Sequence, residues 1–297
     1  MIKTPNFFIV GAARSGTTSL WWYLKQNPQV FMPRNELNKE PAYFSDKNQG
    51  ITTNAFLNLF KEADPKHKLV GEASTAYLTD HKAAQKIKDF NPNAKIIVVL
   101  RNPAERAYSL YNWMVQEGYE YVTSFEKALD VEERRANKII PNFWEPQYYW
   151  NYMYYYSGLY YGQVKKYLDC FGENTLIIKF EDFKNQPKDN FNKVCNFLGI
   201  CKIEPKLSAQ NLSRSVYSPQ IQFVIRKLNN NYIRIRKIFG MQPKSKFSRD
   251  FFVYLGQKPQ KPPPLSKEIR TKLLSRYENH IYELAKITND RFLSWLE

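Results

Sequence analysis

An apolar run that leads directly into a glycine- and hydroxyl-rich loop is the feature that most limits how this chain can fold. Residues 7–10 read Phe-Phe-Ile-Val, and Gly11 and Gly16 then enclose four residues before a helical pattern begins. A short apolar run bounded by glycine is typical of a strand buried on both faces of a sheet. Glycines let backbone N–H groups approach an anion, and the N-terminus of the next helix adds partial positive charge. The segment therefore predicts a strand, an anion-binding loop and a helix in succession.

Further apolar runs alternate with helical patterns along the chain. The runs predict strands at residues 95–100 and 175–180, with a weaker one at 68–72. Helical patterns occur at residues 16–27, 79–90, 103–118, 123–137, 157–171 and 187–198. This alternation indicates a three-layer α/β/α fold around a mostly parallel sheet. We expect a single domain over residues 1–297, with a basic, proline-interrupted subregion at about 215–265.

The first loop keeps part of the nucleotide-triphosphate loop G-x-x-x-x-G-K-S/T and lacks its lysine. Gly11 and Gly16 are in place and Thr18 occupies the Ser/Thr position, but Thr17 stands at the lysine position. Arg14 supplies a cation from within the loop instead. Hydroxyl and glycine residues are poor in helix interiors but good anion donors, which favours anion binding over a plain strand–turn–helix connection. The candidate anion-binding residues are Arg14, Ser15, Gly16, Thr17, Thr18 and Ser19.

The loop after the predicted strand at 95–100 adds a second cation. Magnesium-dependent nucleotide hydrolases usually end such a strand in an aspartate, whereas this one ends in Arg101. Asn102, Pro103 and Glu105 then form a capping-box pattern that starts a helix. Ser109 lies seven residues past Asn102, almost two turns, on the same helix face. Since ligands bind at the carboxyl ends of parallel strands, the two loops predict a polyanion held by protein donors without a metal.

Together these two loops resemble those of the sulfotransferases that use 3′-phosphoadenosine 5′-phosphosulfate (PAPS). Their first motif is similar to residues 14–20 and their second to residues 100–109. The resemblance is closest to the bacterial and heparan-sulfate or carbohydrate-modifying branch. It spans most of the chain, through residues 35–44, 71–78, 157–161, 180–183, 211–222 and 295–296.

The resemblance implies a P-loop-like site and a metal-independent transfer of a sulfonate from PAPS to a hydroxyl or amine, leaving the product PAP. It places the 5′-phosphosulfate on the first loop and the 3′-phosphate on Arg101 and Ser109, with a further contact from Arg214 in a late loop. By analogy with phosphoryl transfer, positioning and electrostatics would supply most of the catalysis. Arg14 stands where many relatives carry lysine, and its permanently charged guanidinium suits charge stabilisation better than proton donation.

The resemblance also indicates a general base. In the glycan-modifying branch the segment similar to residues 39–44 carries the catalytic glutamate, which makes Glu40 our candidate. Lys39 would favour its charged form or contact the sulfonate itself, and a surface Lys–Glu pair is the structural alternative. Glu72, at the end of the weak strand, is the second candidate for the base. The same segment at 39–41 favours a carbohydrate acceptor, while a lipid, a phenol or a small metabolite stays open.

Charge and composition add expectations about partners. Residues 202–297 hold 19 Lys/Arg against 7 Asp/Glu, and residues 226–249 contain no acidic residue. Such a stretch favours an anionic partner such as an anionic membrane or an acidic polysaccharide, and a solvated surface is the alternative. The aromatic run at 148–156 suits either an acceptor groove or a packed core.

Other function classes and the location follow from what the sequence lacks. A P-loop kinase or ATPase would require the missing lysine and a metal, and a nucleic-acid-binding protein would require a recognised motif; we expect no nucleic-acid partner. Three cysteines without metal-ligand spacing are too few for a disulfide framework. With no apolar run of about 18 residues and no signal-peptide pattern, we expect a cytoplasmic protein.

Overall fold

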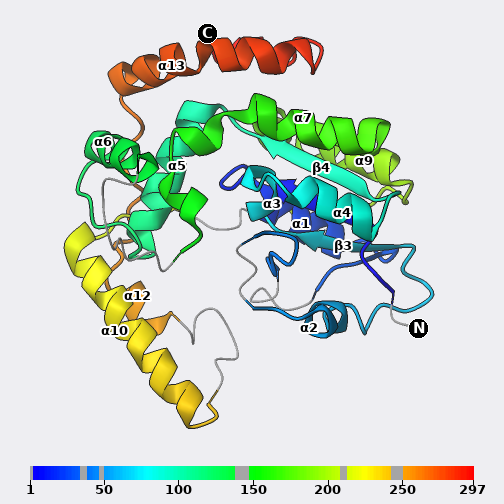
Figure 1. Ribbon diagram of the computed structural model, residues 1–297, viewed down its shortest axis with the longest axis horizontal. Coiled ribbons are helices and arrows are strands. Elements are labelled where there is room, and N and C mark those ends of the chain that lie inside the picture. The colour runs from blue at the N-terminus through cyan, green and yellow to red at the C-terminus, as the bar shows by residue number, and fades with distance from the viewer. Residues whose placement is uncertain (1–2, 34–38, 47–49, 138–146, 208–212, 242–249) are drawn as a thin grey trace. The chain divides into compact units, whose positions relative to one another are not determined.

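The computed structural model describes residues 3–33, 39–46, 50–137, 147–207, 213–241 and 250–297 (Figure 1). The chain divides into two compact units. Unit 1 comprises Met1–Pro103, Leu159–Gln210 and Arg276–Glu297. Unit 2 comprises Ala104–Gly158 and Asn211–Ser275. The expected organisation as a single domain stays a prediction.

Unit 1 is built on a five-stranded sheet in which every described strand pair is parallel. Its strand order is β2-β3-β1-β4-β5. The strands are β1 (Phe7–Gly11), β2 (Val30–Phe31), β3 (Leu69–Ala73), β4 (Lys95–Leu100) and β5 (Thr175–Lys179). In the register, Ile9 of β1 pairs with Ala73 of β3 on one side and Ile97 of β4 on the other. The sheet confirms the expected α/β class.

Helices cover both faces of the sheet. Phe7, Ile97 and Ile178 share one hydrophobic cluster with residues of α1 (Thr17–Lys25), α8 (Phe180–Asn185) and α9 (Pro187–Leu198). The strands also contact α3 (Ala76–Thr79) and α7 (Tyr160–Phe171), and α4 (Ala83–Phe90) packs on both of these helices. Phe8 and Val10 are as fully buried as Phe7. Because both faces are covered, the strand sequences are continuously apolar rather than alternating.

The predicted strands are confirmed to within one residue at each end. The predicted helix at 79–90 is confirmed only over α4, which begins at Ala83, whereas Thr79 is the last residue of α3. The chain is extended at Asp80, and Oδ1 of Asp80 accepts the backbone N–H groups of Lys82 and Ala83. A carboxylate that accepts such amides starts a new helix, which explains the break. The two-residue β2 is too short to give an apolar signal.

Unit 2 contains α5 (Pro103–Gln116, starting at the unit boundary), α6 (Phe125–Ala136), α10 (Pro219–Ile238), α12 (Phe251–Leu255) and the first part of α13 (Lys267–Lys286). Two residues of the aromatic run, Tyr152 and Tyr154, are fully buried. The hydroxyl of Tyr154 donates to Oε2 of Glu120, which is also paired with Arg135 at 3.0 Å. This part of the run therefore packs in the core of unit 2.

Short elements complete the two units. They are α2 (Thr53–Asn58), η2 (Tyr149–Tyr152), η3 (Tyr156–Gly158), η4 (Gly172–Asn174) and η5 (Leu293–Trp295). Among the described helices, none combines the length and the apolar character needed to cross a bilayer.

Candidate active site

The first loop joins β1 to α1 and carries a buried hydroxyl for which the described part of the chain supplies no hydrogen-bond partner. Ser15 is fully buried, and its Oγ has no hydrogen-bond partner among the described residues. Thr17, the first residue of α1, is also buried. Leaving a buried polar group unpaired is costly, so such a group usually meets a ligand or an ordered water. The loop therefore fits an anion that accepts hydrogen bonds.

The start of α1 at Gly16 has no capping side chain and no acidic residue in its first turn. Gly16 is the N-cap of this helix and has φ 83, and a Cβ at this position would lie 3.0 Å from the ring of Phe180. The positive end of the helix dipole is thus left for an external anion.

Arg101, at the end of β4, reaches the first loop. Its Nη1 donates to the backbone carbonyl of Arg14 at 3.4 Å, and its guanidinium lies 5.1 Å from the ring centre of Phe180. The strand order turns from β3 on one side of β1 to β4 on the other, so the topological switch point lies between β1 and β4. Open α/β sheets bind ligands at such a point. Two of the three arginines predicted for the site, Arg14 and Arg101, are therefore in contact through the backbone of the first loop.

Glu181 holds the start of α5 just after Arg101. Its Oε1 accepts the backbone N–H of Asn102 at 2.9 Å, and its Oε2 accepts Nε1 of Trp295 at 3.1 Å. Asn102 in turn donates through Nδ2 to the carbonyl of Trp295. The sequence reasoning noted residues 180–183 and 295–296 only as similar segments, and it missed this positioning role. The signal available was the position of Glu181 one residue after the predicted strand at 175–180.

Two predicted contacts of the 3′-phosphate, Ser109 and Arg214, belong to unit 2. Ser109 lies within α5, as the capping pattern predicted. The backbone N–H of Arg214 donates to Oε1 of Gln116 at 2.8 Å. Residues 211 and 212 of the late loop, and residues 35–38 before Lys39, lie outside the described residues. The roles of Ser109 and Arg214 stay predictions.

Both carboxylate oxygens of Glu40 are held by the protein. Nζ of Lys39 lies 2.6 Å from Oε1, while Oγ1 and the backbone N–H of Thr75 donate to Oε2 at 2.8 and 3.3 Å. The Glu40 side chain is nevertheless 42% exposed, whereas that of Lys39 is buried. Desolvation raises the pKa of Glu40, but the charge of Lys39 and the hydrogen bonds from Lys39 and Thr75 outweigh it, leaving the pKa below its usual value. The carboxylate is therefore ionised and accessible at neutral pH.

Glu72, the second candidate base, has the opposite properties. It is fully buried in β3, and its Oε1 accepts the Ser74 hydroxyl while its Oε2 has no hydrogen-bond partner among the described residues. Burial, together with the nearby charge of Glu40, raises the pKa of Glu72 to about 8, although hydrogen bonds from Ser74 and Tyr77 and the charge of Lys39 act to lower it. Glu72 is thus neutral at pH 7, so burial distinguishes the two carboxyl groups.

The turn after Glu40 is fastened by Ser74, whose Oγ accepts the backbone N–H of Ala42 at 2.9 Å. Ala42 has φ 51 and Arg14 has φ 66, left-handed conformations that residues with a side chain rarely adopt. The other described non-glycine residues with positive φ are Asn289 and Asp290, types that tolerate it better. Backbone strain of this kind is concentrated at functional sites. Here it occurs in the first loop, at Arg14, and in the segment that carries Glu40, at Ala42.

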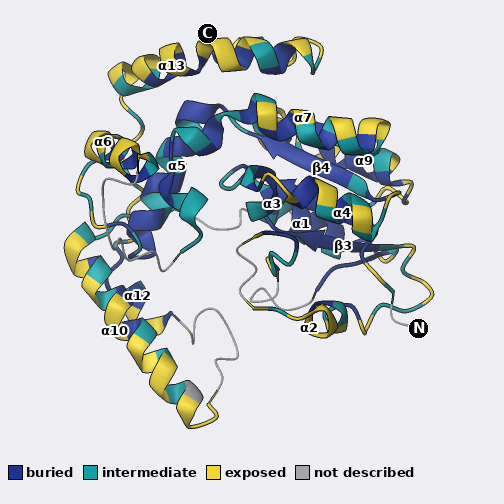
Figure 2. Ribbon diagram, in the orientation of Figure 1, coloured by how far each residue is buried: buried dark blue, intermediate teal, exposed yellow. Residues whose placement is uncertain are grey.

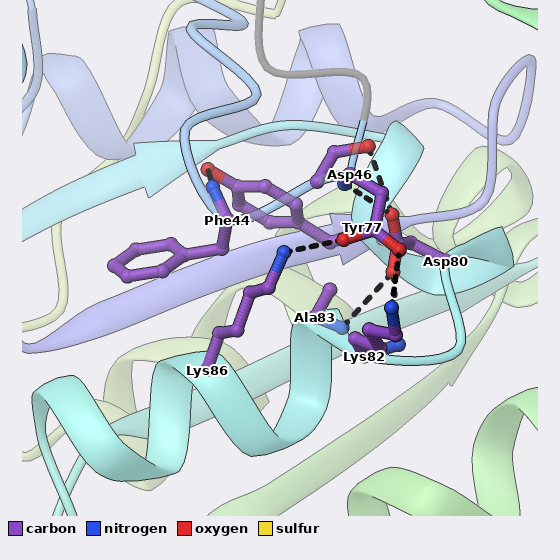
Figure 3. A network of polar contacts seen from close by, with 8 residues as sticks. Phe44, Asp46, Tyr77, Asp80, Lys82, Ala83 and Lys86 are labelled. Carbon is purple, nitrogen blue, oxygen red and sulfur yellow. Dashed lines mark hydrogen bonds and ion pairs between the residues drawn. The ribbon is translucent and has the colours of Figure 1, made fainter. Parts of the chain in front are cut away.

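Beyond Ala42, the same segment is tied to Tyr77 of α3 and to Asp80, which follows α3 (Figure 3). The backbone N–H of Phe44 donates to the Tyr77 hydroxyl at 3.4 Å. Oδ2 of Asp80 accepts the Ser45 hydroxyl at 3.0 Å and the backbone N–H of Asp46 at 2.7 Å. Residues 40–46 are therefore hydrogen-bonded to residues 74–80 at several points, which fixes the position of Glu40.

A cluster of two aspartates and a histidine beside this segment has side chains close enough together to bind a metal ion. Among the described residues, Asp46, Asp80 and His81 place ligand atoms within 4.8 Å of one another. The oxygens of Asp46 are paired with Lys86 at 2.6 Å and Lys82 at 3.4 Å, as Figure 3 shows for this network. Together with the Asp80 contacts above, these bonds give the two carboxylates a structural role.

Comparison with known proteins identifies the family. The family model described as the sulfotransferase domain matches residues 4–248. The chain belongs to the sulfotransferase domain family. A crystal structure of a sulfotransferase from Alicyclobacillus acidocaldarius is similar over 100% of both chains, with a TM-score of 0.73 and 27% identity. The resemblance inferred from the motifs is thereby confirmed.

Curated relatives of this sulfotransferase domain are larger proteins. The bifunctional heparan sulfate N-deacetylase/N-sulfotransferase 4 of Mus musculus is 25% identical over 95% of this chain and 30% of its own length. The membrane-associated sulfotransferase kil1 of Dictyostelium discoideum is 34% identical over 39% of this chain and 24% of its own length. The chain thus spans less than a third of the length of either relative.

Proposed function

We propose that this chain transfers a sulfonate group from PAPS to a hydroxyl or amine of an acceptor and releases PAP. The observation that carries the proposal is the contact between Arg101 and the backbone carbonyl of Arg14, which joins the two cationic loops at the switch point of the sheet. Membership of the sulfotransferase domain family supports the reaction class. We also propose that the two units act as one sulfotransferase domain, since the family match covers residues of both.

The first loop and Arg101 would bind the nucleotide. The hydroxyls of Ser15, Thr17, Thr18 and Ser19 and the amides at the start of α1 would donate to the phosphosulfate, which accounts for the unpartnered Ser15 hydroxyl. The guanidinium of Arg14 would stabilise charge on the bridging oxygen as PAP departs. Arg101, Ser109 and Arg214 would hold the 3′-phosphate. These donors give the loop its affinity for a polyanion without a metal ligand.

Glu40 would act as the general base. As the acceptor atom attacks sulfur, its proton passes to Glu40 while the bond between sulfur and the departing phosphate oxygen breaks. An ionised and accessible carboxylate suits this step, whereas the buried neutral Glu72 does not. Lys39 would keep Glu40 ionised and, as a nearby cation, support negative charge on the sulfonate oxygens.

The acceptor would be a carbohydrate, by two lines of support. The segment that carries Lys39, Glu40 and Pro41 is similar to that of the glycan-modifying branch. The relative that matches 95% of this chain bears a name that includes heparan sulfate N-sulfotransferase. We propose a cytoplasmic location, which three unpaired cysteines favour because reducing compartments keep thiols free.

A transfer assay with labelled PAPS tests the reaction and the acceptor class together. Acceptors with sugar hydroxyls, sugar amines, phenols or lipid headgroups would be incubated with the protein in EDTA. Labelled product from the carbohydrates, unaffected by EDTA, is the expected result. Calorimetry with PAP and with ATP is the companion measurement. ATP binding without PAP binding, or activity that EDTA abolishes, would indicate a kinase or ATPase and overturn the proposal.

A further inference from the structure

Helix α10 of unit 2 buries polar side chains and exposes a line of apolar ones. Its inward positions hold Gln222, Arg226 and Asn229, each at most 2% exposed. Its outward side, next to the exposed polar residues Lys227, Asn231 and Arg234, carries five apolar residues that are between 42% and 62% exposed: Ile221, Val224, Leu228, Tyr232 and Ile235. A surface helix normally buries its apolar stripe and presents polar residues to solvent. We call these five outward residues the α10 stripe.

Buried polar contacts fix this orientation of α10. Arg226 pairs through Nη2 with Glu117 at 3.0 Å and through Nη1 with Asp250 at 2.5 Å, and its guanidinium lies 4.6 Å from the ring centre of Tyr119. Nε2 of Gln222 adds bonds to the backbone of the α5 and α12 segments. Turning the helix would leave three buried charges without partners, which is strongly unfavourable. The α10 stripe is therefore held outward by the core of its own unit.

Exposed residues run along α10 (Figure 2), and the α10 stripe among them has cationic flanks. Its members recur every three or four residues, so they form one line along the helix. Lys227 and Arg234 are exposed beside it, and the sequence holds no acidic residue between Glu204 and Asp250. Helix α12 packs on α10 and extends the exposed apolar surface through Phe251, Phe252 and Leu255.

We propose that the α10 stripe and its cationic flanks form a surface that rests on an anionic lipid bilayer. A bilayer matches both parts of the surface, because acyl chains accept the aliphatic side chains while acidic headgroups attract the flanking Lys and Arg. A second copy of the chain would bring the cations of two stripes together. An acidic polysaccharide would match the cations but would leave Leu228 and Ile235 without an apolar partner. The bilayer is therefore the partner that the composition favours.

Vesicle co-sedimentation of the full chain tests the proposal without using transfer activity. Neutral phosphatidylcholine vesicles would be compared with vesicles that contain phosphatidylserine, at low and high salt. We expect binding only to the anionic vesicles, weakened by salt. The double variant L228S/I235S should lower binding at least about tenfold, since it removes two inserting side chains. Arg234→Gln should weaken binding to anionic vesicles less than the double variant does.

A matched control is Tyr282→Ser on α13, because Tyr282 is 45% exposed but lies away from the stripe in sequence and element. It should bind vesicles like the wild type. Circular dichroism and the unfolding midpoint show whether L228S/I235S is folded, and the single variant Leu228→Ser serves if it is not. Wild-type protein that stays in the supernatant with anionic vesicles overturns the proposal. So does a stripe-dependent dimer in sedimentation velocity, or heparin binding that the double variant weakens as strongly as vesicle binding.

Discussion

Thr75 is joined to Glu40, 35 residues earlier in the chain, by two hydrogen bonds to the same carboxylate oxygen. The other oxygen is paired with Lys39. Glu40 itself lies in an irregular segment, whereas Thr75 follows β3 and opens α3. Hydrogen bonds from the start of α3, just after β3, thus set the direction of the Glu40 carboxylate, and fixed placement is what a general base requires.

Thr75→Ala should shift the acid limb of the kcat/KM profile to higher pH. The hydroxyl of Thr75 lowers the pKa of Glu40, so its removal should raise that pKa and move the acid limb with it. A pH–rate series with PAPS and a fixed acceptor measures the shift. Thr75→Ser keeps the hydroxyl and is the matched control. A uniform loss of rate with an unmoved acid limb would contradict the role of Thr75.

Glu40→Gln should lower turnover with little change in nucleotide affinity. Loss of a general base typically costs about 10²- to 10⁴-fold in rate. The glutamine keeps the size of the side chain and one acceptor for Thr75 but has no charge for Lys39. Steady-state kinetics and PAP titration calorimetry measure the two effects separately. A large loss of PAP affinity with this variant would show that Glu40 holds the nucleotide rather than the acceptor proton.

Arg101→Ala should weaken PAP binding, in contrast to Glu40→Gln. A charge-assisted contact to a phosphate is worth about 1.5–3 kcal/mol, so the dissociation constant should rise about 10- to 100-fold. Arg101→Lys keeps the charge without the planar donor pair, so its affinity for PAP should lie between those of the wild type and Arg101→Ala. Titration calorimetry of both variants with PAP is the measurement. Unchanged affinity in Arg101→Ala would remove Arg101 from the proposed nucleotide site.

The strands of unit 1 were predictable because burial on both faces leaves an unbroken apolar run. Phe7, Phe8 and Val10 show this in β1, where each is fully buried. The two loops at the switch point followed from the same runs, since the carboxyl ends of parallel strands meet at one edge. Helix α10 was not predicted, because its buried face is polar and only its charge stood out in the sequence.

The choice between the two carboxyl groups needed three-dimensional information. Glu40 and Glu72 are each glutamates near a predicted strand or turn, and the sequence offers no measure of their exposure. The structure separates them through burial and through contacts that join residues 40–42 to Ser74 and Thr75, at least 32 positions away. Ser74 and Thr75 carry those contacts, yet in the sequence they are two ordinary hydroxyl residues after Glu72. Long-range hydrogen bonds of this kind have no periodic signature.

Arg226→Met should destabilise the protein by about 3–5 kcal/mol, because it leaves two buried carboxylates without their partner. The free energy of unfolding from urea denaturation is the measurement. Arg234→Met, at an exposed position of the same helix, should change it by less than about 0.5 kcal/mol. Similar stability of the two variants would show that Arg226, Glu117 and Asp250 do not hold α10 as the structure indicates.

Glu72→Gln should become more stable relative to the wild type as the pH rises from 5 to 8. The pKa of Glu72 is about 8 in the folded chain against an ordinary value of 4.5. Between these values the unfolded chain has released a proton that the folded chain keeps, so the free energy of unfolding of the wild type falls with rising pH. The fall attributable to Glu72 is at most about 1.4 kcal/mol per pH unit, and it ends above its folded pKa.

The glutamine removes this dependence, since it is neutral in both states at every pH. Urea denaturation at pH 5, 6, 7 and 8 measures the difference between the two proteins. Buried Glu132, whose pKa rises to about 7, has the same sign of dependence in both proteins and therefore cancels in the comparison. Parallel stability curves, or a Glu72→Gln variant that becomes less stable relative to the wild type as the pH rises, would mean that Glu72 is ionised in the folded chain. Glu72 would then again be a candidate for the general base, as an alternative to Glu40.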